Sequence, residues 1–290
     1  MRRLPGRFSV CSPYRLTSRP AFKLVEVILI IAIITILFML LLPALQKTSG
    51  HNQMQIMCKN QLRQLALASQ NHHDVNGQYA PGTVAGSANE PNERLSCFAE
   101  LLPYVERPNV YKSLDRRKSW QAPSNEDAVN KTIKAFLCPS DPLCNRQSPN
   151  HTSYVGIAGA GMDAASLLIT DARCGIFGYD RTVRLEDVKD GTANTLLFLE
   201  TRRDNGPWAA GGSATVRGID TDDDPPVGPD CAFGLHVGRR RGFVGRHKTS
   251  AMAAMADSSV RNIGDGTSAE VLAALATIAG SDSDGLRIDW

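Results

Sequence analysis

The sequence lacks the paired metal ligands and the nucleophile motif on which many hydrolases depend. Its cysteines include no Cys-x-x-Cys pair and its histidines no His-x-x-x-His pair, so a zinc cluster is not predicted. No Gly-x-Ser-x-Gly segment is present to supply an activated serine. We therefore predict a protein that is not an enzyme, with no metal site and no cofactor.

Acidic residues are missing from the N-terminal segment, residues 1–21, which carries five arginines. Without those five, 27 basic residues remain against 29 acidic ones, and the net charge changes from +3 to about −2. The basic character is thus confined to one end of the chain. It gives no argument for a nucleic-acid partner.

Polar side chains are almost absent from residues 27–42, where Thr35 is the exception. The apolar character extends from Leu24 to Leu45, and a helix of that length spans roughly 33 Å, enough for the hydrocarbon core of a bilayer. We expect a single-pass helix in the inner (cytoplasmic) membrane, with the lipid bilayer as a partner; a buried core helix is the alternative. Because the arginines precede this helix, the N-terminus is expected in the cytoplasm and the bulk of the chain in the periplasm or at the cell surface.

Glu26 lies near the start of this apolar run, where a carboxylate in lipid is costly unless it is paired. The stretch AFKLVEVILIIAIITILFMLLLPAL resembles the N-terminal segment of type IV prepilins and type II secretion pseudopilins. The resemblance implies cleavage by prepilin peptidase between Ala21 and Phe22, methylation of the new N-terminus, and pairing of Glu26 with the terminal amine of a neighbouring subunit. Ala21 departs from the usual glycine and Lys23 from the usual threonine. The alternatives are a secretory signal peptide and a Glu26 that reaches back to interfacial water.

Six cysteines follow the N-terminal segment, which itself contains Cys11. An even number in an oxidising compartment permits up to three disulfides, whose pairing the sequence does not determine. Free buried thiols are the alternative. The candidates for disulfides are Cys58, Cys97, Cys138, Cys144, Cys174 and Cys231.

Helical periodicity continues after Pro43 but becomes amphipathic. The dipeptide Asn76-Gly77 is a strong stop signal, so we predict one helix over residues 22–74 with a bend at Pro43 or near Ser49-Gly50. The stripe expected to face a globular domain consists of Met54, Cys58, Leu62, Leu65 and Ser69.

Several later segments resemble a large bacterial family of exported, pseudopilin-like proteins whose body is a domain of unknown function. They are CKNQLRQL, the stretch from HHD to GQYAPG, LLPYVE, FLCPSDP, DGTANTL and a His-x9-Asp tail. In the tail, Ser258 stands where the family usually has glycine. We expect structural roles, in turns and hydrogen bonds, for the motif residues Cys138, Asp141, Asp190, Asn194, His247 and Asp257.

Two of these segments, and an acidic loop, can also be interpreted as functional sites. His247 and Asp257 could serve as a general base pair, and His72-His73-Asp74 could suggest a metal site, although adjacent helical side chains point about 100° apart. Residues 219–226 hold four carboxylates, which suggests calcium as a cofactor, but the EF-hand spacing is absent and a solvated acidic loop is the preferred interpretation.

Short β-like runs at 153–159, 175–177, 195–200 and 251–256 precede a closing helix at 269–279. We predict an α+β fold of the type IV pilin kind, in which a long N-terminal helix packs on an antiparallel, loop-rich β domain. The expected regions are a basic prepilin leader at 1–21, a transmembrane helix at 22–45, its amphipathic continuation at 46–75 and an exported domain at 76–290.

These observations lead to three functional hypotheses. The first is a pseudopilin-like structural protein that assembles with copies of itself or with other pseudopilins into a pilus-like or secretion-associated fibre. The second is a membrane-anchored extracytoplasmic protein that does not polymerise and displays its domain to calcium, a glycan or a partner. The third is an exported hydrolase that uses His247 and Asp257.

Overall fold

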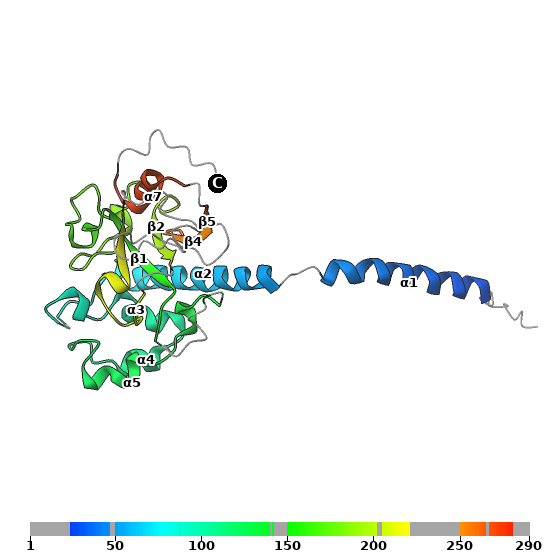
Figure 1. The fold of residues 1–290 in the computed structure, drawn as a ribbon, viewed down its shortest axis with the longest axis horizontal. Coiled ribbons are helices and arrows are strands. Elements are labelled where there is room, and N and C mark those ends of the chain that lie inside the picture. Colours follow the sequence, from blue (N-terminus) through cyan, green and yellow to red (C-terminus); the bar gives the residue numbers. More distant parts are fainter. Residues whose placement is uncertain are drawn as a thin grey trace, which may run out of the picture. The chain divides into compact units, whose positions relative to one another are not determined.

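The computed structural model describes residues 24–46, 50–86, 88–139, 141, 150–201, 205–220, 250–264 and 267–280. The chain divides into two compact units, Met1–Ser49 and Gly50–Trp290. The first unit contains helix α1 (Leu24–Gln46), and the second contains helix α2 (Gly50–Asn76) and every later element (Figure 1). The single helix that the sequence predicts over 22–74 is therefore described as two helices, with Pro43 inside the first.

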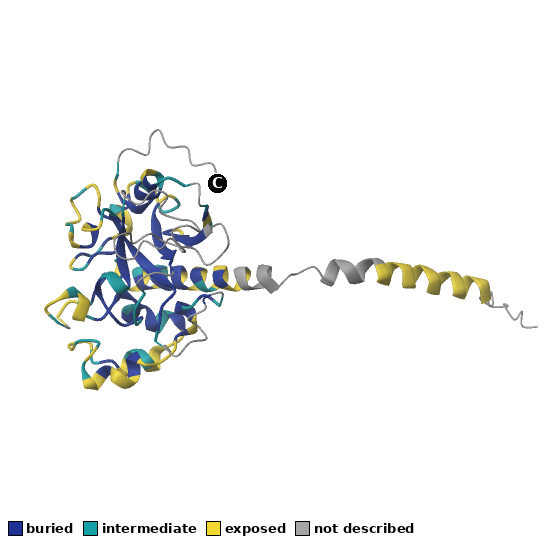
Figure 2. Ribbon diagram, in the orientation of Figure 1, coloured by how far each residue is buried: buried dark blue, intermediate teal, exposed yellow. Residues whose placement is uncertain are grey.

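Helix α1 exposes apolar side chains throughout the part in which side chains are described, Leu24–Met39 (Figure 2). Its one polar uncharged residue in that part, Thr35, donates its hydroxyl hydrogen to Ile31 O at 2.7 Å, so the helix itself satisfies this group. Within the described residues, no helix meets the combined length and hydropathy expected of a membrane span.

Helix α2 packs one face against the globular unit, as its periodicity predicts. Cys58, Leu62, Leu65 and Ser69 are all fully buried, which confirms the predicted stripe wherever its side chains are described. The helix ends at the predicted stop. Gly77 adopts a φ of 73°, which glycine tolerates without steric cost, and its N–H donates to His73 O at 2.7 Å.

Short helices and turns connect α2 to a five-stranded sheet with the order β3-β1-β2-β4-β5. All strand pairs are antiparallel except β1 with β3, which is parallel, so the sheet is mixed and not purely antiparallel as the sequence suggests. The strands are β1 (Tyr154–Ala160), β2 (Leu196–Glu200), β3 (Val216–Ile219), β4 (Ser250–Met255) and β5 (Val260–Gly264). The α-helices are α3 (Cys97–Leu101), α4 (Pro108–Ser113), α5 (Glu126–Val129) and α7 (Ala269–Ala276), and the 3-10 helices are η1 (Pro91–Glu93), η2 (Leu102–Val105), η3 (Pro123–Asn125), η4 (Lys134–Phe136), η6 (Ala164–Ser166), η7 (Leu185–Asp187) and η8 (Gly212–Ala214).

The sheet is covered on both faces. Tyr154 lies in the core on the α2 side and its hydroxyl donates to Cys58 O at 3.3 Å, whereas the next residue, Val155, lies in the core that α7 covers. Successive residues of a strand point to opposite faces, which explains why β2 is buried along its whole length and β1 in all but its last residue. The α+β prediction is confirmed.

The β4–β5 hairpin turns through Ser258, whose φ of 65° lies in the left-handed region. Its hydroxyl is buried and has no hydrogen-bond partner among the described residues. We expect Ser258→Gly to raise the free energy of unfolding by about 0.5–1 kcal/mol, because glycine removes both the steric strain and the buried hydroxyl. Urea denaturation of the full chain would measure this change.

Ser259 supplies a matched control, because its hydroxyl is also buried without a described partner but its φ is not positive. Ser259→Gly should lower the free energy of unfolding by a similar amount through the greater freedom of the unfolded chain. Equal effects of the two substitutions would contradict the assignment of strain to Ser258.

Candidate binding pocket and motif residues

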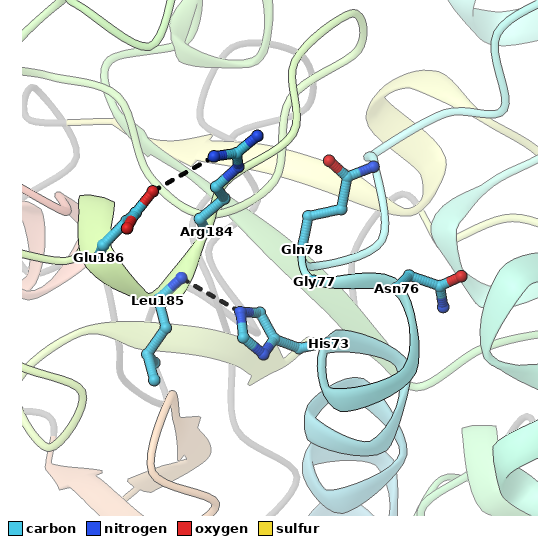
Figure 3. A pocket seen from close by; sticks show the side chains of 7 residues that line it. All are labelled: His73, Asn76, Gly77, Gln78, Arg184, Leu185 and Glu186. Carbon is cyan, nitrogen blue, oxygen red and sulfur yellow. Dashed lines mark hydrogen bonds and ion pairs between the residues drawn. The ribbon is translucent and has the colours of Figure 1, made fainter.

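A cavity of about 680 Å³ lies where α2 ends and meets η7. His73 reaches it from the last turn of α2, and Arg184 and Glu186 enter from the opposite wall (Figure 3). The residues that line it are His73, Asn76, Gly77, Gln78, Arg184, Leu185 and Glu186.

The His73 ring is held by the facing segment. Its Nε2 accepts a hydrogen bond from Leu185 N–H at 3.2 Å, which requires an unprotonated Nε2 and leaves the proton of the neutral ring on Nδ1. Nδ1 lies 3.8 Å from an Asp74 carboxylate oxygen. Across the pocket, Arg184 Nη1 lies 3.3 Å from Glu186 Oε1. The described residues that line the pocket thus offer hydrogen-bond donors and acceptors, and none of them is a serine, threonine or cysteine.

His72 points away from this pocket into the fold. It is buried, its Nδ1 lies 3.1 Å from Gln78 O, and its ring packs edge-on against Tyr104. Burial lowers the pKa of His72, although the hydrogen bond to Gln78 and the charge of Glu100 partly oppose that effect. The adjacent imidazoles make separate contacts, as expected for consecutive residues of a helix.

The Cys-Pro-Ser-Asp segment joins two distant parts of the fold. Cys138 forms a disulfide with Cys58 of α2, with the Cα atoms 4.8 Å apart, and this confirms that at least one disulfide is present. Asp141 is buried, and its Oδ2 accepts from Ser153 Oγ at 2.8 Å and lies 3.1 Å from His151 Nε2. Because the serine donates to the aspartate and not to the histidine, these three residues do not form a nucleophilic triad.

Two candidate disulfide cysteines are free thiols, which corrects the prediction for them. Cys97 is fully buried at the start of α3, and burial raises the pKa of its thiol to about 12. The Cys174 thiol donates to Ile169 O at 3.3 Å, and burial also raises its pKa. Cys11, Cys144 and Cys231 lie outside the described residues.

One group of metal-type ligands is present in the described part of the chain. Cys58, Cys138 and Glu200 place one ligand atom each within 4.8 Å of one another, all buried. The two sulfurs are bonded to each other, so neither is the thiolate that a metal requires. The geometry is that of a disulfide beside a buried carboxylate.

The Asp-Gly-Thr-Ala-Asn-Thr segment forms a turn that receives the end of α7. Asp190 Oδ2 accepts from Gly280 N–H at 2.9 Å and from the Thr277 hydroxyl at 3.3 Å, and burial raises the pKa of Asp190. The Asn194 amide donates to Asp190 O at 3.2 Å. These contacts connect the turn to the end of α7 and are structural in kind.

Other predicted site residues do not come together in the described structure. Glu26 is exposed on α1, and Asp257 is exposed in the β4–β5 turn, where its Oδ1 accepts from Ser259 N–H at 2.8 Å. Ala21, Phe22, His247 and most of the acidic loop at 219–226 lie outside the described residues.

Arg181 is a buried residue that the sequence analysis missed. Its guanidinium donates to five backbone carbonyls, and burial lowers its pKa. Two of the acceptors are Gly175 O and Phe177 O. The run 175–177, predicted as a strand, is not assigned as one in the described structure, and the isolated bridge at this point joins the preceding residue, Cys174, to Gly159. A single arginine between two glycine-rich loops carries no periodic signal that could have identified it.

A protein family described as "Protein of unknown function (DUF1559)" matches residues 54–270. The chain belongs to this family. No curated protein and no solved structure gives a significant match. The DUF1559 match includes the pocket, the Cys58–Cys138 disulfide and the whole sheet, whereas α1 and Glu26 precede it. The pocket and the disulfide therefore belong to the DUF1559 domain.

Proposed function

We propose that this DUF1559 protein is a membrane-anchored structural protein that assembles through α1 into a pilus-like or secretion-associated fibre. The observation that carries the proposal is the surface of α1. Apolar side chains are exposed along Leu24–Met39, including Leu24, Ile28, Ile31 and Phe38. A helix that is apolar all round requires lipid or other helices around it.

Glu26 is the feature that points to assembly beyond simple anchoring. It is the one charged residue of Leu24–Met39. After cleavage before Phe22, the new terminal ammonium and the Glu26 carboxylate would lie near the same end of α1. In staggered parallel helices the two charges can pair between subunits and offset the cost of burying each.

Export into an oxidising compartment is part of the same proposal. The Cys58–Cys138 disulfide supports it, because stable structural disulfides are typical of oxidising compartments. The five arginines before α1 support a cytoplasmic N-terminus. In this arrangement the DUF1559 domain lies on the far side of the inner membrane.

Replacing Glu26 with alanine should remove contacts between neighbouring copies. In cells that express the full chain, amine-reactive cross-linking should give a ladder of oligomers for the wild type and at least a fivefold weaker ladder for Glu26→Ala. The expected loss follows from leaving the neighbour's terminal ammonium buried without a partner.

Glu90→Gln is the matched control, because Glu90 is an exposed acid on the globular unit. It should leave the ladder unchanged. A ladder that is equally strong in Glu26→Ala would overturn assembly through this residue and favour the anchored, non-polymerising protein. The mass of the mature N-terminus is an independent check: a methylated Phe22 supports prepilin processing, and an intact Met1 contradicts it.

The second candidate, a non-polymerising anchored binding protein, has its own supporting observation. The cavity of about 680 Å³ at the end of α2 is lined by the imidazole-bearing His73 and by the exposed Arg184 and Glu186. Cavities of this size with a few fixed polar groups are typical of ligand sites.

A further inference from the structure

A second cavity, of about 450 Å³, lies on the globular unit beside η3 and α5, and it differs chemically from the pocket at His73. One wall is the indole of Trp120. The other side chains include three amides and one carboxylate, from Gln121, Asn130, Asn150 and Glu126. We refer to it as the Trp120 cleft.

Trp120 lines the cleft and is fixed by hydrogen bonds, one of which occupies its indole N–H. The indole N–H donates to Asn92 O at 2.9 Å, and the backbone N–H donates to Glu93 O at 3.3 Å. The ring is partly buried and packs against the main core. An aromatic ring held in one orientation provides contact area with little loss of conformational entropy on binding.

The polar groups around the ring retain capacity for hydrogen bonds. The Asn150 amide donates to Asn130 Oδ1 at 3.3 Å, which orients both side chains. An amide has two N–H donors and a carbonyl with two lone pairs, so one such bond leaves donors and acceptors on each residue. Gln121 and Glu126 are exposed at the rim of the cleft.

The charge of the cleft restricts the class of ligand that it can bind. Among the described residues that line it, Glu126 is the one charged side chain, and none is a lysine, arginine or histidine. A carboxylate without a lining cation disfavours anionic ligands. The lining also provides too few anionic groups to hold a divalent cation.

We propose that the Trp120 cleft binds a neutral saccharide. One face of a pyranose ring presents polarised C–H groups, which are attracted to the negative face of an indole. Its neighbouring hydroxyls both donate and accept, which matches the amides of Asn130 and Asn150 and the carboxylate of Glu126. This inference goes beyond the proposed assembly and does not depend on it, since α1 takes no part in the cleft.

The test uses the full chain in a detergent without a sugar headgroup. Isothermal titration with cellotetraose, maltotetraose, tetra-N-acetylchitotetraose and tetragalacturonate should reveal millimolar or tighter binding of at least one neutral member. The uronate should bind at least tenfold more weakly. Trp120→Ala should weaken binding of the neutral sugar at least tenfold, and Asn130→Ala several-fold.

Two further variants separate recognition from damage to the fold. Glu126→Gln should reduce the discrimination against the uronate. The control is Asp127→Asn: Asp127 is an exposed acid on the same short helix and is not among the residues that line the cleft. This substitution should change neither the affinity for the neutral sugar nor the affinity for the uronate. Failure of every neutral saccharide to bind would overturn the proposal. So would binding that persists unchanged in both Trp120→Ala and Asn130→Ala. Loss of the oligomer ladder in Glu26→Ala would have no bearing on these titrations.

Discussion

Replacing Cys58 or Cys138 with serine should lower the free energy of unfolding by about 2–5 kcal/mol, because the disulfide closes a loop whose ends are 80 residues apart. In the chain-entropy description a loop of that length is worth about 4–5 kcal/mol. For a domain of this size the melting temperature should fall by about 5–15 °C. Thermal unfolding of the full chain, with and without reductant, would measure it.

The double variant Cys58→Ser/Cys138→Ser should be no less stable than either single variant, because both single changes break the same bond. Cys97→Ala is the control. It removes a buried free thiol and should leave the difference between reduced and oxidised samples unchanged. Additive losses in the double variant would show that the two cysteines act separately and not through a disulfide.

Arg181→Met should lower the free energy of unfolding by about 3–5 kcal/mol, since it removes the guanidinium donors from five backbone carbonyls while keeping most of the side-chain volume. Nη1 donates to Ala164 O and to Leu167 O at 2.8 Å each, and Nη2 donates to Phe177 O at 2.6 Å. The remaining acceptors are Ala158 O and Gly175 O. Together these bonds join β1 to η6 and its end and to the segment 175–177.

Arg181→Lys should recover only part of the lost stability, because an ammonium has fewer donors and lacks the planar fork. Arg173 is the matched control. Its side chain is 48% exposed and pairs with Asp163 at 2.9 Å, so Arg173→Met should leave the free energy of unfolding nearly unchanged. Similar losses for Arg173→Met and Arg181→Met would contradict the central role of Arg181. Urea denaturation would compare the three variants.

Local patterns in the sequence were sufficient for the N-terminal helices, for α7 and for three of the five described strands, whereas the short helices α3, α4 and α5 were not predicted. The buried stripe of α2 repeats at helical spacing, and the stop at Asn76-Gly77 depends only on adjacent residues, so both could be predicted without knowledge of the fold. Three of the four β-like runs became β1, β2 and β4 for the same reason. The fourth, 175–177, is not a strand: Gly175 N–H and Phe177 N–H donate to β1 carbonyls, whereas Gly175 O and Phe177 O accept from the Arg181 side chain.

Non-local features could not be predicted. The parallel pairing of β3 with β1 depends on where the intervening chain crosses the domain, which composition does not encode. Asp141 was identified as a turn residue, but its partners His151 and Ser153 lie beyond the motif and had no recognisable pattern. The Trp120 cleft likewise combines residues from segments that are joined only in the folded unit.

The packing of α2 against β4 has a consequence for biosynthesis. The Gln70 side chain donates to Ala256 O, and these residues are 186 positions apart. Helix α2 emerges from the ribosome early, yet strand β4, which covers it, is among the last elements to be translated. Until then the nascent chain exposes an unfinished hydrophobic surface, so completion of this core waits for the C-terminal strands.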